Sequence, residues 1–221
     1  MAQDKTIFLI RHGESTYNEW VFQSYRQQTW EGYRDPMLID ARLSQRGRQQ
    51  VQALNQNVLH HRVHESIQVV ITSPLARAIE TALGGFEGTG IPIQVNSLCR
   101  EMLDASCDVG RQPAELAREF SHRGIDVSKL SEYWWLNHPV SLTTIIPQSQ
   151  EQLATLKETM PEFHDRVRRF LEHVASMRET SIAVVCHGNF ISYLTQSQHH
   201  PANCEVRQMS LSRLWATVQS S

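Results

Sequence analysis

The end of the first apolar run is the feature that most constrains the fold of this chain. Residues 7–10 read Ile-Phe-Leu-Ile, which is typical of a buried strand, and Arg11-His12-Gly13 follows at once. Two later apolar runs, at residues 69–71 and 183–186, also lead into polar residues. Open α/β sheets bind ligands where their parallel strands end. If the three strands are parallel neighbours, two histidines and two arginines should converge at one edge: His12, His187, Arg11 and Arg77, with Gly188 next to His187.

Such a cluster has the chemistry of a phosphate site. The planar guanidinium groups of Arg11 and Arg77 can each clamp a pair of phosphoryl oxygens. The imidazole of His12 is largely unprotonated near neutral pH and can act as a nucleophile. His187 adds a donor when protonated, and a nearby phosphate favours that form. The helices expected after residues 13 and 73 should also turn their positive ends toward this edge.

Strands alternate with helices along the chain, which predicts an α/β fold with a mostly parallel central sheet and helices on both faces. We expect a single domain over residues 1–221, with an insertion at about 102–148 over the C-terminal edge of the sheet. Residues 21–42 show no periodicity and predict a loop, and one or two strands should complete the chain. The predicted strands are 6–10, 67–72, 91–95 and 181–186, and the predicted helices are 14–20, 44–61, 73–83, 112–122 and 189–195, with one more helix from the apolar stripe between 163 and 174.

Composition narrows the classes of partner. The formal net charge of −2 and the spread of 21 basic residues along the chain give no electrostatic case for binding nucleic acid or an anionic membrane. The four cysteines lack zinc-type spacing and favour free thiols in a reducing compartment. A strand predicted within the first ten residues leaves no room for a signal peptide, so we expect a cytoplasmic protein. No metal site or cofactor is indicated, and the oligomeric state is not readable.

The complete motifs are more specific than any one of their residues. Arg11-His12-Gly13-Glu14-Ser15-Thr16-Tyr17-Asn18 is followed in order by the run from Ser73 to Ala82, by Cys99-Arg100-Glu101 and by His187-Gly188. This set resembles the histidine phosphatase superfamily, which includes cofactor-dependent phosphoglycerate mutase and fructose-2,6-bisphosphatase. The resemblance implies that His12 is the nucleophile and that Asn18 adds an amide contact to the phosphate.

A leaving alkoxide needs a proton, so the site requires a general acid. In the family that this chain resembles, the acid often follows an arginine after the third strand, which points to Glu101. Glu101 must then have a raised pKa to stay protonated at working pH. Glu14 and Asp104 are the alternatives that the sequence leaves open.

The motifs predict a metal-independent phosphomonoester hydrolase that acts through a phosphohistidine on a small phosphorylated metabolite. The alternative is a phosphoglycerate mutase, but mutases of this kind follow the glutamate with Arg and then Tyr-Gly, whereas Met102-Leu103-Asp104 follows Glu101 here. A non-catalytic scaffold for phosphorylated ligands is the other alternative, and it would have no need of a nucleophile such as His12.

The substrate itself cannot be named from the sequence. Arg26, Arg34, Arg42 and Arg111 are consistent with a second anionic group on the substrate and equally with a solvated surface. Trp134-Trp135 could line a substrate pocket or pack the insertion onto the core.

Overall fold

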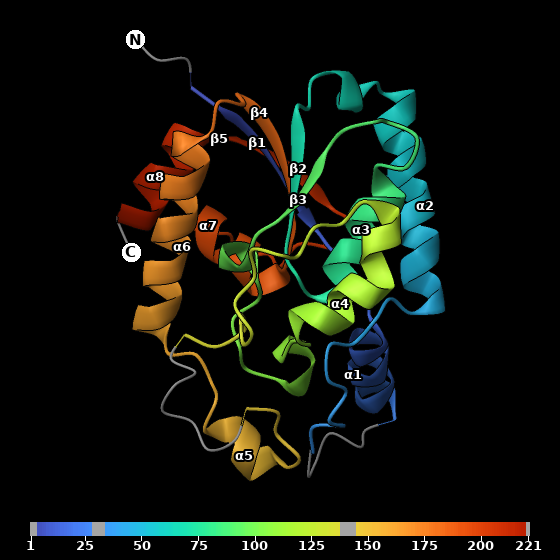
Figure 1. Cartoon of the computed structure of the whole chain (residues 1–221), viewed down its shortest axis with the longest axis vertical. Coiled ribbons are helices and arrows are strands. Elements are labelled where there is room, and N and C mark those ends of the chain that lie inside the picture. Colours follow the sequence, from blue (N-terminus) through green and yellow to red (C-terminus); the bar gives the residue numbers. More distant parts are fainter. Residues whose placement is uncertain (1–3, 28–33, 138–144, 220–221) are drawn as a thin grey trace.

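The core of the molecule is a five-stranded sheet in the order β3-β2-β4-β1-β5. The computed structural model describes residues 4–27, 34–137 and 145–219. Four strands are parallel, and β5 pairs antiparallel with β1. The predicted α/β fold with a mostly parallel sheet is therefore confirmed (Figure 1). The strands are β1 (Thr6–Arg11), β2 (Val69–Thr72), β3 (Ile93–Val95), β4 (Ser181–Cys186) and β5 (Val206–Ser210).

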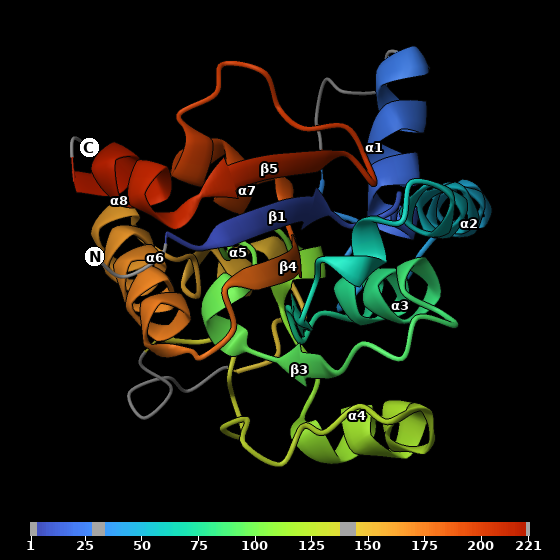
Figure 2. The same cartoon turned by 90° about the horizontal axis from the view of Figure 1, so that it is seen from above.

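Helices cover both faces of the sheet, as Figures 1 and 2 show from two directions. Because successive strand residues point to opposite faces, β1 serves two cores. Ile7 and Leu9 pack with α6, α7 and α8, whereas Phe8 and Ile10 pack with α2 and α3. The helices are α1 (Thr16–Arg26), α2 (Gln45–His60), α3 (Ala76–Gly85), α4 (Pro113–Phe120), α5 (Gln150–Ala154), α6 (Met160–Ser176), α7 (Gly188–Thr195) and α8 (Leu211–Gln219).

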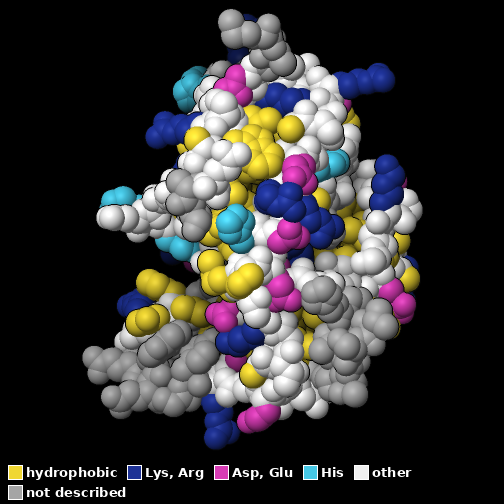
Figure 3. All heavy atoms as spheres, turned by 90° about the vertical axis from the view of Figure 1, so that its left-hand side faces the viewer, with side chains coloured by type: hydrophobic (Ala, Val, Ile, Leu, Met, Phe, Trp, Pro, Cys, Tyr) yellow, Lys and Arg dark blue, Asp and Glu magenta, His cyan; other side chains and the backbone are white. Residues whose placement is uncertain are grey.

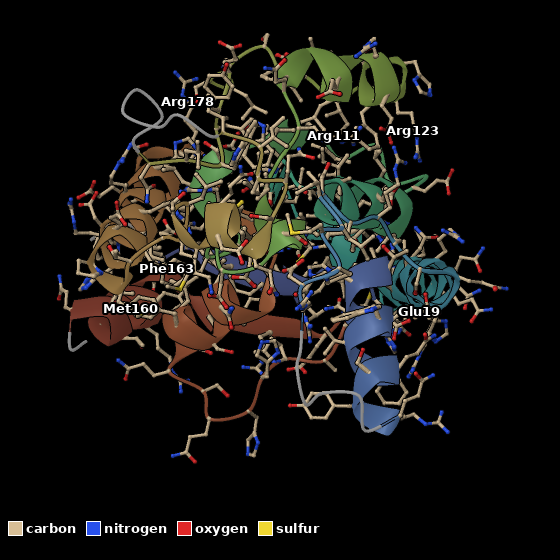
Figure 4. The ribbon with its side chains drawn as sticks, turned by 90° about the horizontal axis from the view of Figure 1, so that it is seen from below. Glu19, Arg111, Arg123, Met160, Phe163 and Arg178 are labelled. Carbon is tan, nitrogen blue, oxygen red and sulfur yellow. The ribbon has the colours of Figure 1, made fainter. Side chains whose placement is uncertain are left out.

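The longest helix, α6, follows from its sequence. Thr159 and Glu162 form a capping box, and Pro161 sits in the first turn, where its missing N–H costs nothing. The predicted apolar stripe is buried against the sheet. In Figure 4 Phe163 and Met160 mark the start of this helix, and Met160 is exposed.

The segment between β3 and α6 builds a third core of its own. Its apolar side chains pack on one another and on the outer face of α3. Figure 2 shows α4 outside the edge strand β3. Trp134 and Trp135 are buried, and their rings meet edge to face at 5.6 Å, so both indoles pack the insertion.

The structure differs from the predicted elements most clearly at three places. Helix α1 continues to Arg26, although residues after Trp20 were expected to be a loop, because the turns of this helix leave aromatic side chains exposed and so give no apolar period. Near the end of the chain β5 is the one strand expected, but it is followed by the unpredicted helix α8, whose Leu211, Leu214 and Val218 are buried at helical spacing. Helix α3 begins at Ala76 rather than at Ser73.

The face formed by α6 and α8 is chemically mixed. Figure 3 shows hydrophobic side chains on this face separated by basic, acidic and histidine side chains. None of the described helices is both long enough and apolar enough to cross a membrane.

Candidate active site

The ends of β1 and β4 bring the two motif histidines together. Arg11 pairs with Cys186 in the parallel register, so His12 and His187 occupy the next position on neighbouring strands. The His12 N–H donates to the Cys186 carbonyl at 3.0 Å, and the two imidazole centroids lie 5.1 Å apart. Figure 4 views the molecule from the side of these strand ends. The predicted convergence of the two histidines is present in the structure.

His12 is held in one tautomer by its backbone. Its Nδ1 lies 2.7 Å from the Gly13 carbonyl oxygen, which can only accept, so Nδ1 carries the proton. Nε2 is then unprotonated, and its lone pair accepts a hydrogen bond from the Arg77 Nε at 3.2 Å. Burial and then the positive charges of Arg77 and Arg11 lower the pKa of His12 well below its usual range. His12 is thus a neutral imidazole with Nε2 turned to the cationic groups.

Arg77 reaches the site from the first turn of α3 and is almost fully buried. Besides the contact with His12, its Nη1 donates to the Cys107 carbonyl and its Nη2 donates to Asp108 Oδ1 at 2.8 Å. The Thr81 hydroxyl ties this turn of α3 to β1, because it accepts from the Gly13 N–H and donates to the Arg77 carbonyl.

His187 and Arg11 present polar atoms without partners to the same edge. Among the described residues, neither ring nitrogen of the buried His187 has a hydrogen-bond partner, and the buried Nε of Arg11 has none. Burial and then the charge of Arg77 lower the pKa of His187 well below its usual range. Leaving such buried polar groups unmatched costs free energy, which is typical of a site prepared for a polar ligand. Arg11 Nη1 donates to the Pro201 carbonyl at 2.7 Å.

Glu101 is buried and lies within electrostatic range of Arg11 and Arg77. Its Oε1 accepts from the Met102 N–H at 2.9 Å, and its Oε2 accepts from the Asn189 N–H at 3.1 Å. Burial, and then the like charge of Asp108, raise the pKa of Glu101 to about 7. Glu101 therefore has the raised pKa that an acid near neutral pH requires.

The two alternative acids have other surroundings. The Glu14 carboxylate accepts from the Ser44 hydroxyl at 2.7 Å and faces Arg46 at 3.7 Å. The Asp104 side chain is 66% exposed and pairs with Lys157 at 2.8 Å. Of the three carboxylates, Glu101 is the one that is both buried and within electrostatic range of Arg11 and Arg77.

Asn18 and Gly188 each have a role in the local fold near the strand ends. Asn18 Oδ1 accepts from the Ser15 N–H, and the Asn18 N–H donates to the Ser15 hydroxyl, so the two residues cap α1. Gly188 begins α7, and a Cβ there would meet the His200 ring at 1.9 Å.

The N-terminus of α3 is already occupied by a side chain. Asp40 Oδ1 accepts from the Ala76 N–H at 2.7 Å, and Ser73 Oγ accepts from the Leu75 N–H. Asp40 also pairs with Arg111, which lies between α4 and α3 in Figure 4. The predicted cap by the Ser73 hydroxyl is replaced by this carboxylate, which explains the later start of α3.

Comparison with known proteins decides the family. The model of the histidine phosphatase superfamily (branch 1) matches residues 7–217. This chain belongs to the histidine phosphatase superfamily. It is 30% identical over 234 residues to phosphoglycerate mutase-like protein 1 of Arabidopsis thaliana, covering 93% of this chain and 80% of the relative.

Two solved phosphatase structures with the same fold serve for comparison. The α-ribazole phosphatase of Shigella flexneri superposes with a TM-score of 0.53 at 20% identity, over 92% of this chain and 89% of that one. The mycobacterial glucosyl-3-phosphoglycerate phosphatase superposes with a TM-score of 0.53 at 20% identity, over 94% and 91%. These likenesses place the fold among histidine phosphatases.

Three residues at this histidine phosphatase site were not singled out in the sequence. Asp108 pairs with Arg77, Asn203 Nδ2 donates to the His12 carbonyl at 2.9 Å, and the His200 ring lies 3.3 Å from Arg11 Nη1. No local sequence pattern marks Asp108, Asn203 or His200. Asp108 lies in the segment after β3, and His200 and Asn203 lie in the segment between α7 and β5. Only the folded sheet brings these segments to the site.

Proposed function

We propose that this protein is a metal-independent phosphomonoesterase that transfers the phosphoryl group of a small phosphorylated metabolite to His12 and then to water. The geometry of His12 carries the proposal. Its proton is held on Nδ1 by Gly13, and the Nε2 lone pair faces Arg77. A neutral, oriented imidazole beside cationic donors is what nucleophilic attack on phosphorus requires.

In the first step, the His12 Nε2 lone pair attacks phosphorus in line with the leaving oxygen. The P–N bond forms, the bond from phosphorus to the leaving oxygen breaks, and Glu101 gives its proton to that oxygen. Arg11, Arg77 and His187 stabilise the charge on the equatorial oxygens, and Asn18 adds an amide donor. The dianionic phosphoryl group raises the low pKa of His187, so His187 binds as a donor.

In the second step, water attacks the phosphohistidine. The Glu101 carboxylate, now ionised, takes a proton from that water as the P–N bond breaks. Inorganic phosphate leaves, His12 regains its neutral form, and Glu101 has its proton again. The same carboxylate serves both steps because a pKa near 7 allows both protonation states at neutral pH.

Hydrolysis is favoured over the mutase reaction by the residues after Glu101. Met102 and Leu103 stand where mutases carry substrate-binding residues, and Leu103 is buried in the insertion core. The family match and the phosphatases among the structural likenesses support the same reading. Two of the arginines considered for a second anionic group already form ion pairs: Arg42 with Glu80 and Glu119, and Arg111 with Asp40 and Glu119.

Rapid quench in alkaline detergent with a ³²P-labelled sugar phosphate tests the proposal. With EDTA present throughout, the wild type should trap label that is stable to alkali and lost in acid, as phosphohistidine is. His12→Ala should lose the label and nearly all turnover. The matched control is His122→Ala, since His122 lies exposed in the insertion. This variant should retain both the label and turnover. Label retained by His12→Ala, or a wild type that is inactive until a divalent metal is added, would overturn the proposal.

A further inference from the structure

Asp108 is a second buried carboxylate at this site, and the proposed reaction leaves it without a role. It ends a short 3-10 turn, Ser106–Asp108, and is 6% exposed. Its Oδ1 faces Arg77 Nη2 at 2.8 Å. Its Oδ2 accepts from the Ala105 N–H at 3.1 Å and from the Asp104 N–H at 3.4 Å. The carboxylate is fixed on both oxygens, so its negative charge is held in one place.

The contacts of Arg77 show what this charge does to the guanidinium. Asp108 and the Cys107 carbonyl hold the two terminal nitrogens, and Nε is left to meet His12 Nε2. Because the guanidinium is planar, fixing both terminal nitrogens fixes the direction of Nε. Asp108 therefore sets the angle at which Arg77 faces the nucleophile.

Asp108 also acts on Glu101 through space. The charged groups that face the Glu101 carboxyl are Asp108 from the 3-10 turn, Arg77 from α3 and Arg11 from β1. Arg166 of α6 donates to the Glu101 carbonyl and not to its carboxyl. After burial, the charge of Asp108 is the largest influence that raises the pKa of Glu101, and Arg77 opposes it.

We infer that Asp108 is a positioning residue of this site, which orients Arg77 against His12 and places a fixed negative charge within electrostatic range of Glu101. The inference rests on the proposed function. Asp108 touches neither nucleophile nor leaving group, so it acts through Arg77 and Glu101. Loss of its charge should therefore have two separable effects, one on every substrate and one only on substrates that need an acid.

The test is Asp108→Asn, which retains the size of the side chain and removes its charge. The control is Asp104→Asn, which changes net charge equally in the same loop at a side chain that is 66% exposed. Formation of the phosphoenzyme is measured in single turnovers against pH, with glycerol phosphate and with nitrophenyl phosphate. Circular dichroism checks that each variant is folded.

For glycerol phosphate, removing the charge lowers the pKa of Glu101, so the acid form is lost at lower pH. The alkaline limb of the pH–rate profile of Asp108→Asn should therefore lie about one pH unit lower than that of the wild type. Nitrophenyl phosphate leaves without a proton, so its rate should show no limb due to Glu101 in the wild type or in Asp108→Asn. Both substrates should also lose about 10²-fold in rate, because Arg77 is less well oriented. Asp104→Asn should match the wild type.

A ¹³C titration of the Glu101 carboxyl gives the same answer without turnover, and it should show the lower pKa in Asp108→Asn. If Asp108→Asn does not fold, Asp108→Glu carries the test: it keeps the charge, so it should lose rate with both substrates while the alkaline limb stays in place. An Asp108→Asn profile equal to that of Asp104→Asn, or a limb of Asp108→Glu that moves, would overturn the inference. A wild type without phosphohistidine would instead overturn the proposed function.

Discussion

His12 and His187 lie one residue beyond the paired ends of β1 and β4, with ring centroids 5.1 Å apart and a tilt of 58° between the planes. Both rings are buried beside Arg77, and both have a pKa well below the usual range. Two imidazoles at this distance cannot both be cations without strong repulsion. The pair is therefore neutral until a phosphoryl group enters between the arginines.

This pairing makes stability depend on pH. Below about pH 6.5 the unfolded chain protonates a histidine whose folded pKa is depressed, so the folded state loses stability as pH falls. Glu101 has a raised pKa in the folded protein, so its contribution to stability falls as pH rises between its unfolded pKa and its folded pKa of about 7. The contribution of His187 is isolated by comparing the wild type with His187→Gln.

Urea unfolding at pH 5 to 7 should show that His187→Gln reduces the slope of unfolding free energy against pH, by about 1.4 kcal/mol per unit (one proton) at the acid end of this range and by less near pH 7. His199→Gln is the control, since His199 is exposed. An unchanged slope in His187→Gln would mean that the pKa of His187 is not lowered in the folded protein.

Glu101 should matter in proportion to the basicity of the leaving group. With an alkyl phosphate, Glu101→Gln should slow the first step by about 10² to 10⁴, the usual value of acid–base assistance. With nitrophenyl phosphate, the first step should be nearly unchanged, and the phosphoenzyme should accumulate as a burst because water is no longer activated. Single-turnover and burst measurements decide this.

Asp104→Asn is the control for the Glu101 prediction and should retain both rates. Equal losses for the two substrates in Glu101→Gln would remove this residue from the acid role and direct attention to Glu14, or to Asp104 if Asp104→Asn itself loses rate.

The sheet edge could be predicted because a local sequence pattern marks the end of each of these strands: an apolar run that stops at a polar residue. His12, Arg77 and His187 lie at or just beyond such strand ends, so this local pattern predicts them. Asp108 could not be found in this way, because its burial depends on where residues 102–112 pack against α3. Its sequence neighbourhood shows only a carboxylate in an irregular segment.

Arg166 shows the same limit inside a correctly predicted helix. The apolar stripe of α6 predicted packing against the sheet, which the structure confirms. It could not predict that Arg166 is also buried and that it donates to the carbonyls of Leu98, Arg100 and Glu101. A buried arginine is evident only when its partners are in place, and those partners come from a distant loop.

Asn18 has two separable roles, as a helix cap and as the proposed phosphate contact. Ser15→Ala removes the hydroxyl that accepts from the Asn18 N–H and leaves the Asn18 amide, whereas Asn18→Ala removes the amide, whose Oδ1 accepts from the Ser15 N–H, and leaves the hydroxyl. Each should cost about 1 kcal/mol of stability, the usual value of a cap. The KM for a phosphomonoester should rise several-fold only in Asn18→Ala. Steady-state kinetics and thermal unfolding measure the two effects, and an equal rise in both variants would leave Asn18 as a cap alone.

Glu158 neutralises two buried arginines, and its loss should be the most damaging of these changes to stability. Its carboxylate accepts from Arg166 Nε at 2.8 Å and from Arg100 Nη2 at 3.2 Å, and its side chain is 1% exposed. Removing one partner of a buried ion pair leaves an unpaired charge, which costs about 3 to 5 kcal/mol. Glu158→Gln should lower the free energy of unfolding by that amount in urea titrations.

The matched control for Glu158 lies on α6 itself. Asp165 pairs with Arg168 at 2.8 Å, with both side chains about half exposed, so Asp165→Asn should cost less than about 1 kcal/mol. Arg166 also holds the backbone that carries Glu101, so the folded fraction of Glu158→Gln should in addition lose activity on alkyl phosphates more than on nitrophenyl phosphate. A loss of stability no larger than that of Asp165→Asn would show that the two arginines are solvated and need no carboxylate between them.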